Sequence, residues 1–150
     1  MTARTQAARI GLLILNGFVA ISAIAGAIWV VPTMPMEWIK YGPFTDWTIP
    51  AIALGFVGVL AAVTFVLVIA RPWAGSLASI VAGAAMVIFE LVEVGVVGWT
   101  LTDPTLSGFQ KSLQLVYLIV GSAQLLLGIA LWAGTRRSAP AIPVIHPTPA

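Results

Sequence analysis

The chain has 150 residues, of which 60% are hydrophobic, 8% are charged and none is cysteine. An ordinary soluble domain carries about 25% charged residues, so seven basic and five acidic side chains cannot cover a soluble globule of this size. The mean hydropathy of +1.05 indicates a membrane protein. The composition therefore excludes a soluble enzyme, a disordered chain and a disulfide-stabilised secreted module.

The side chains that several kinds of chemistry require are missing. Without cysteine the chain has no thiol nucleophile, iron–sulfur cluster or cysteine-based zinc site. The single histidine, His146, lies in a proline-rich segment, so paired haem ligands, a histidine metal site and a Ser-His-Asp triad are not expected. The cations form no stripe that would bind nucleic acid. We therefore expect no metal, no other cofactor, no nucleic-acid partner and no enzymatic activity.

Four apolar stretches are long enough to cross a bilayer as helices, which takes about 20 residues each. The predicted helices cover residues about 10–31, 49–70, 74–101 and 113–133. Pro32 is predicted to end the first helix and Thr48 to cap the second. The short turn Arg71-Pro72-Trp73 makes the second and third helices an antiparallel hairpin. The predicted fold is all-α: an integral membrane four-helix bundle over residues 1–135, followed by a disordered Pro-rich tail at 136–150.

The distribution of cations predicts the orientation in the membrane. The N-terminal segment, the second loop and the tail hold Arg4, Arg9, Arg71, Arg136 and Arg137, whereas the first and third loops hold Lys40 and Lys111. The positive-inside rule then places both termini in the cytoplasm, in a multi-pass protein of the bacterial inner membrane. An alternative is that the first apolar run is a cleaved signal with Ala23-Ile24-Ala25 as its cleavage site, although the run continues beyond Ala25 as an anchor would.

Two acidic residues lie inside the third predicted helix. Glu90 and Glu93 are spaced i, i+3 and share a face with Gly83 and Met86. An ionisable side chain inside a span is costly and indicates a functional site by default. Two neighbouring carboxyls titrate as a coupled unit, as in a proton or cation relay. The alternative is structural: a protonated Glu90 hydrogen-bonds a neighbouring helix, and Glu93 reaches the headgroup zone.

The fourth predicted helix offers a partner face. Its polar and small residues recur at spacings of 3, 4, 3 and 4, namely Gln114, Tyr117, Gly121, Gln124 and Gly128. A turn near Leu106 is predicted to bring Glu93 near Tyr117, and Glu90 near Gly121 and Ser122. The candidate proton, cation or interhelical site therefore comprises Glu90, Glu93, Tyr117 and Gln114. Polar and small residues also serve simply to pack membrane helices closely, and Asn16, Ala20, Ala23 and Ala27 form such a stripe on the first helix.

The first outer loop ends with two further candidate residues. Asp46 directly precedes the second predicted helix, where a carboxylate satisfies free backbone N–H groups and the helix dipole. Trp47 is one of the aromatic residues that anchor the outer ends of the helices at headgroup depth.

The same loop resembles that of an uncharacterised family of small four-helix bacterial membrane proteins. The resemblance rests on Pro43-Phe44-Thr45-Asp46-Trp47-Thr48-Ile49-Pro50, then on Arg71-Pro72-Trp73, Glu90 and Glu93, and spans Pro43 to about Trp132. The motif P-F-x-D-[WY]-x-I-P before the second helix is typical of the group, which has no assigned activity, so no functional role carries over. The chain also resembles small multidrug transporters in size and helix count. Those place their essential glutamate in the first helix, and this first helix has none.

Three functions follow as predictions. The first is a non-enzymatic structural or accessory membrane component, which packs against the lipid bilayer and against a second copy or a larger membrane complex. The second is a small proton- or cation-coupled carrier that uses Glu90 as its coupling site, assisted by Glu93, Tyr117 and Gln114. The third is an enzyme acting on lipid or quinone at the outer face with Glu93 and Asp46, which is the weakest, since carboxylates without a metal or histidine support few such reactions.

Overall fold

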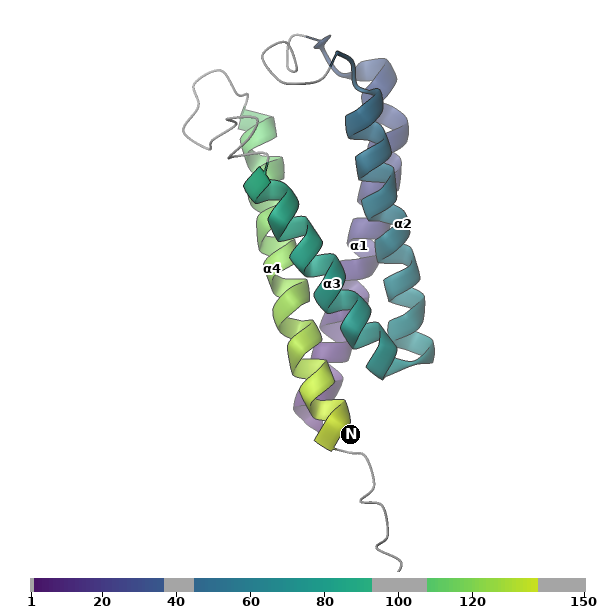
Figure 1. The fold of residues 1–150 in the computed structure, drawn as a ribbon, viewed down its shortest axis with the longest axis vertical. Coiled ribbons are helices and arrows are strands. Elements are labelled where there is room, and N and C mark those ends of the chain that lie inside the picture. The colour runs from purple at the N-terminus through teal and green to yellow at the C-terminus, as the bar shows by residue number, and fades with distance from the viewer. Residues whose placement is uncertain (1, 37–44, 93–107, 138–150) are drawn as a thin grey trace, which may run out of the picture.

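The computed structural model describes residues 2–36, 45–92 and 108–137, and these form four helices (Figure 1). They are α1 (Ala3–Thr33), α2 (Thr48–Ala70), α3 (Pro72–Val92) and α4 (Gly108–Arg137). Each helix is long and apolar enough to span a membrane. The all-helical fold of the described residues and four helices of spanning length are therefore confirmed. The tail was predicted at 136–150, but Arg136 and Arg137 belong to α4, and the rest of the predicted tail lies outside the described residues.

The first helix is longer at both ends than predicted. It begins at Ala3 rather than at Ile10, because the Thr2 hydroxyl caps it and accepts a hydrogen bond from the Thr5 backbone N–H at 3.3 Å. It ends at Thr33, two residues beyond the predicted end at Val31, so the prediction that Pro32 ends it was wrong. Proline lacks a backbone N–H and removes one helical hydrogen bond, but it does not prevent a last turn from closing.

The start of α2 corrects one prediction and supports another. Thr48 is the first residue of the helix and not its cap, a position that Trp47 occupies without a side-chain hydrogen bond. The Asp46 carboxylate instead accepts a hydrogen bond from the Thr48 backbone N–H at 2.8 Å. This is the role predicted for Asp46, since the first N–H groups of a helix have no partner within the helix.

The hairpin of α2 and α3 has a connection of a single residue, Arg71. A Cβ atom on Gly75 would lie 2.5 Å from the Val68 backbone, so only glycine allows the two helices to lie this close at the turn. The predicted antiparallel hairpin is confirmed. The third helix was predicted to reach residue 101, but α3 is described only to Val92, and Glu93 lies outside the described residues.

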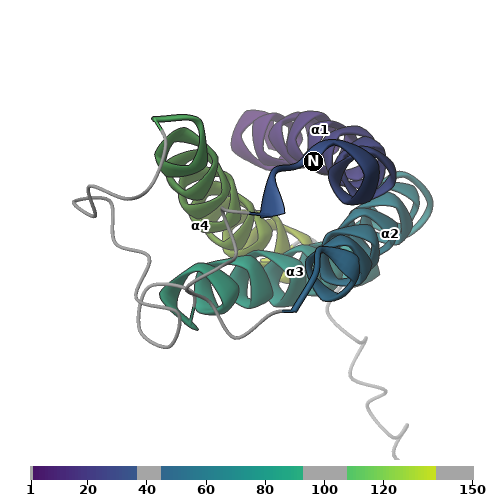
Figure 2. The ribbon, with the colours of Figure 1, turned by 90° about the horizontal axis from the view of Figure 1, so that it is seen from above.

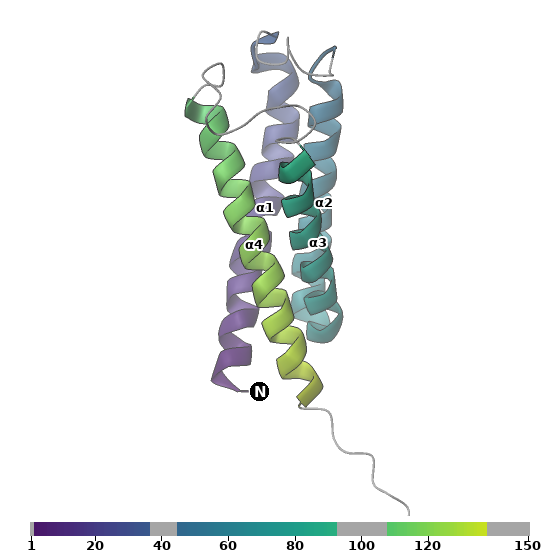
Figure 3. The ribbon, with the colours of Figure 1, turned by 60° about the vertical axis from the view of Figure 1, so that its left-hand side comes forward.

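The helices form a ring in chain order, in which α4 returns to pack beside α1 (Figures 2 and 3). Figure 1 shows α3 inclined across the bundle, beside α2 at the turn and beside α4 further along. The interior holds two apolar clusters. One comprises Val19, Ala23, Ala61, Met86 and Val120, and the other comprises Ala8, Leu12, Val68 and Leu131.

Large apolar side chains cover the outside of the bundle. Ile14, Ile21 and Phe56 are each about two-thirds exposed or more, at 66%, 75% and 69%. The inward faces hold smaller and more polar residues, including Asn16, Thr64, Ser76, Ser79 and Gln124. Water would penalise this exterior, whereas lipid tails match it. The distribution of residues therefore fits a bilayer environment.

Glycines let the helix backbones of α3 and α4 touch. A Cβ atom on Gly83 would lie 2.6 Å from both the Gly121 carbonyl oxygen and the Leu125 backbone nitrogen. Further along the same contact, a Cβ atom on Gly128 would lie 3.0 Å from the Ile80 backbone nitrogen. Apolar burial gives membrane helices little reason to associate, so close backbone approach of this kind supplies much of the packing energy.

Candidate functional site

Two buried amides join α1 to α4 at the middle of the bundle. The Asn16 amide nitrogen donates to the Leu12 carbonyl oxygen at 2.8 Å, which leaves the Asn16 Oδ1 as an acceptor. The Gln124 Nε2 donates to that oxygen at 3.1 Å. Because the carbonyl of Leu12 can only accept, this chain of bonds also sets the orientation of both amides. Gln124 therefore presents its Oε1 away from Asn16, and this buried oxygen has no hydrogen-bond partner within the described part of the chain.

Glu90 lies on the buried face of α3. Its side chain is only 6% exposed, and it shares the inward face with Gly83 and Met86, as the sequence pattern predicts. The carboxyl is an electrostatic neighbour of the Tyr117 hydroxyl of α4, and this hydroxyl forms a hydrogen bond with Ser22 of α1. The structure thus brings three side chains from three helices, Glu90, Tyr117 and Ser22, into one polar group.

The predicted register between α3 and α4 was wrong by about one helical turn. Glu90 was expected beside Gly121 and Ser122, but a Cβ atom on Gly121 would lie 2.9 Å from the Cβ of Met86 and 3.2 Å from the Gly83 carbonyl. Glu90, one turn beyond Met86, therefore faces Tyr117. Glu93, which was predicted to face Tyr117, lies outside the described residues.

Gln114 completes the polar stripe of α4. It is 8% exposed, and Gly121, Gln124 and Gly128 on the same stripe are also buried. The stripe predicted from the 3, 4, 3, 4 spacing is therefore the inward face of the helix. Its glycines pack against α3, whereas Gln124 bonds to α1 and Tyr117 bonds to α1 and faces Glu90. The residues of this one face of α4 therefore contact both α3 and α1.

Asp46 and Trp47 tie together the segments at the opposite end of the bundle from the N-terminus. Asp46 is exposed, and hydrogen bonds from the backbone and side chain of Thr48 lower the pKa of its carboxyl below 3.8. The Trp47 indole N–H donates to the Pro35 carbonyl oxygen at 3.3 Å, which links the end of α1 to the start of α2. Both residues act on helix ends here, Asp46 as an N-terminal acceptor and Trp47 as a cross-link between segments.

The end of the bundle where the chain begins is rich in arginine. Arg9 donates from Nε to the Val68 carbonyl at 3.2 Å and from an Nη to the Ile69 carbonyl at 2.9 Å. These are carbonyls of the last turn of α2, which lack helical partners and carry the negative end of the helix dipole. Arg136 stacks over the Trp132 ring at 4.0 Å. In the sequence these arginines indicate only the orientation in the membrane, and their structural roles were not predicted.

Other buried hydroxyls are bonded within their own helices. Thr64 donates to Leu60 and Ser79 donates to Gly75, in each case to the carbonyl one turn earlier at 2.8 Å. Such bonds allow a hydroxyl to be buried without a partner on another helix. Among residues 2–36, 45–92 and 108–137, no three His, Cys, Asp or Glu side chains lie close enough together to hold a metal ion.

Comparison of the chain with protein-family models, curated proteins and solved structures finds no match.

Proposed function

We propose that the chain is a non-enzymatic, four-pass integral membrane protein that acts as a structural or accessory component of a membrane assembly. The observation that carries this proposal is the way the buried polar groups are used. Asn16 and Gln124 bond α1 to α4, the hydroxyls of Tyr117 and Ser22 bond the same two helices, and Thr64 bonds within its own helix. Polar side chains that lock helices together suit a rigid component.

The cations support an orientation with both termini in the cytoplasm of a bacterial cell. The start of α1, the turn between α2 and α3 and the end of α4 lie at one end of the bundle, which holds Arg4, Arg9, Arg71 and Arg136 (Figure 1). At the other end, the described residues place one cation, Lys111, and one carboxylate, Asp46. Under the positive-inside rule the arginine-rich end faces the cytoplasm of the inner membrane.

The proposal is tested by gentle extraction from the native host followed by native mass spectrometry. A larger membrane protein that co-purifies in fixed stoichiometry is the expected result. The matched control is a variant in which a lipid-facing residue of α2, Val63, is changed to alanine, since this change leaves the interior intact. A monomer or homodimer that is recovered free of other proteins from mild detergents and from lipid nanodiscs alike would overturn the accessory role.

A second function, a proton- or cation-coupled carrier, is favoured by one specific observation. Glu90 is buried inside a span and lies in electrostatic range of the Tyr117 hydroxyl. Carboxyls inside spans mark proton relays in many pumps and transporters. In this function Glu90 binds and releases a proton, Tyr117 orients it, and Gln114 and Glu93 assist toward the outer end.

The substitution Glu90→Gln separates the two functions, because it keeps the shape of the side chain and removes its proton chemistry. If the chain is a carrier, liposomes that hold the variant lose a pH-driven flux that the natural chain shows, while the melting temperature changes little. If Glu90 is structural, no flux exists to lose, and only the melting temperature falls. Tyr117→Phe is the companion variant, since it removes the neighbouring hydroxyl and leaves the carboxyl in place.

The third function, an enzyme of lipid or quinone at the outer face, receives the least support. Asp46 already accepts hydrogen bonds from Thr48 at the start of α2, which is the role of a helix cap. Ester or phosphate turnover that Asp46→Asn abolishes would establish it.

A further inference from the structure

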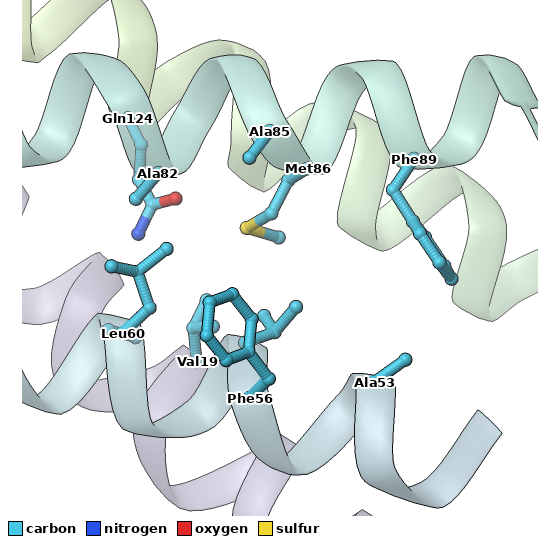
Figure 4. A pocket seen from close by; sticks show the side chains of 11 residues that line it. Val19, Ala53, Phe56, Leu60, Ala82, Ala85, Met86, Phe89 and Gln124 are labelled. Carbon is cyan, nitrogen blue, oxygen red and sulfur yellow. The ribbon is translucent and has the colours of Figure 1, made fainter. Parts of the chain in front are cut away.

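The α2 and α3 helices enclose an apolar cavity of about 210 Å³ (Figure 4). The two helices diverge above their one-residue turn, and short side chains on the facing sides, Ala53, Ala82 and Ala85, leave the space between them. Two aromatic rings stand at its walls, Phe56 of α2 and Phe89 of α3. Both rings are also exposed to the lipid side of the bundle, at 69% and 44%, so the cavity adjoins the bilayer.

One polar side chain reaches the inner wall of this cavity. Gln124 is fully buried and lines the cavity, and its Nε2 is held by Asn16. Its Oε1 is the buried acceptor that has no hydrogen-bond partner among the described residues. Figure 4 shows this oxygen on the side of the amide that faces Met86. Met86 is a flexible side chain that repacks at low cost, so a small displacement of it exposes the oxygen to an occupant.

We propose that this cavity binds a bilayer-soluble phenol, which enters between Phe56 and Phe89 and donates its hydroxyl hydrogen to the Gln124 Oε1. Three features of the cavity select this chemistry. Its volume exceeds the roughly 150 Å³ of an apolar cavity that holds benzene. Two aromatic rings and one thioether, Phe56, Phe89 and Met86, stand in an otherwise mostly aliphatic lining and favour an aromatic ring as the occupant. Its lone polar atom is an acceptor, and a buried acceptor left unbonded is costly enough to select a ligand that carries a donor.

This site shares Gln124 with the bond between α1 and α4 on which the accessory role rests, but it uses the other end of that amide. It uses the α2–α3 side of the bundle, whereas Glu90 and Tyr117 belong to the contact between α3 and α4. A protein that binds a phenol without any larger partner, or the reverse, would separate the two proposals.

The test uses two fluorinated ligands of nearly equal shape, 4-fluorophenol and fluorobenzene, with the full chain in lipid nanodiscs. Binding is followed by ¹⁹F NMR, and each affinity is corrected for the partition of the ligand into protein-free nanodiscs. Both ligands are expected to show a protein-bound resonance. The phenol is expected to bind about three- to tenfold more tightly, which is the contribution of one hydrogen bond.

The variant Gln124→Leu removes the acceptor, and the two ligands should then bind equally. Because this change also removes the partner of Asn16, a second variant leaves the amides untouched. Ala85→Phe fills the cavity and should abolish both bound resonances, whereas Ala130→Phe, the same change at an exposed position of α4 outside the cavity, should leave them unchanged.

Three results would overturn the proposal. Equal binding of the two ligands to the natural chain would mean that the amide oxygen selects nothing and is satisfied by water or by the protein. The absence of a bound resonance for either ligand would mean that lipid chains or side chains fill the space. Equal weakening by Ala85→Phe and Ala130→Phe would place the ligands elsewhere on the bundle.

Discussion

At the contact between α3 and α4 two helix backbones touch, and Gly83→Ala tests this contact directly. The added Cβ atom would lie 2.6 Å from the Gly121 oxygen and the Leu125 nitrogen, whereas ordinary contacts begin at 3.4 Å. The two backbones must therefore separate by about 0.8 Å, the difference between these distances. A gap of 0.5–1 Å forfeits a quarter to a half of the attraction between facing atoms. We expect the free energy of unfolding to fall by about 1–3 kcal/mol.

The matched control is Gly55→Ala on α2. There the added Cβ atom would lie 3.5 Å from the Cβ of Ala27, which is an ordinary contact. Both substitutions raise helix propensity by the same amount, about 1 kcal/mol, so the difference between the two variants isolates the steric effect. Gly55→Ala should be neutral or slightly stabilising.

The assay is reversible unfolding in mixed micelles with increasing SDS, followed by far-UV circular dichroism and tryptophan fluorescence. The midpoint for Gly83→Ala should lie clearly below that of the natural chain, and the midpoint for Gly55→Ala at or above it. Equal stability of the two alanine variants would refute the reasoning, because it would mean that the α3 and α4 backbones do not touch at Gly83.

Three further predictions test other parts of the structure. Arg9→Gln removes the cationic donor from the last turn of α2 and should lower the free energy of unfolding by about 1 kcal/mol in the same assay; an unchanged midpoint would contradict the contact. Because the chain has no cysteine, Met86→Cys combined with Gly121→Cys tests the register: the two Cβ atoms would lie 2.9 Å apart, so a disulfide should form on mild oxidation once the backbones separate by about 0.6 Å, while a pair displaced by one turn along α3 should form none. Hydrogen bonds from Thr48 lower the pKa of the Asp46 carboxyl. The carboxylate therefore stabilises the start of α2 fully above the unfolded pKa near 3.8, and this stabilisation is lost as the pH falls through the lower folded pKa. Carboxyl ¹³C NMR titration should give a pKa below 3.8, and a pKa at or above 3.8 would count against the cap.

The four apolar helices were predictable because the bilayer imposes one strong rule. Every backbone polar group inside lipid must be bonded within its own helix, so an uninterrupted apolar run predicts a span with little ambiguity. The ends were less predictable. The first apolar run begins at Ile10, so the helix was predicted to begin there. The alanine-rich segment before Ile10 continues the helix back to the Thr2 cap. Likewise, Pro32 stands inside the last turn of α1.

The inward faces were also predictable, but the register was not. Glycine and polar residues recur along α4 about once per turn, so a shift of one turn leaves the same kinds of residues facing α3. The register depends on which residues of α3 pack against each glycine of α4. The sequence does not show that Gly83 and Met86 pack against Gly121. The prediction that Glu90 lies beside Gly121 failed for this reason.

Neither the bond between Asn16 and Gln124 nor the cavity beside it was predicted. Both amides lay on stripes that the spacing identified, but their meeting depends on α4 closing the ring against α1, which is a property of the whole bundle. The cavity depends on the sum of side-chain volumes on two facing helices. Alanine is common in membrane helices, so these residues do not predict a cavity by themselves. The space arises because Ala53 of α2 faces Ala82 and Ala85 of α3.

Whether Glu90 carries protons or only joins helices depends on whether its proton exchanges. A carboxyl that only joins helices works best when it stays protonated, so glutamine can replace it. A carboxyl that carries protons must alternate between two charge states, and each state needs neighbours that tolerate it. Tyr117 can donate to an ionised Glu90 or accept from a protonated one, because its hydroxyl has both capacities. The hydroxyl of Ser22 completes the group and can reorient with it. Retention of function in Glu90→Gln would show that only the protonated state of Glu90 is ever used.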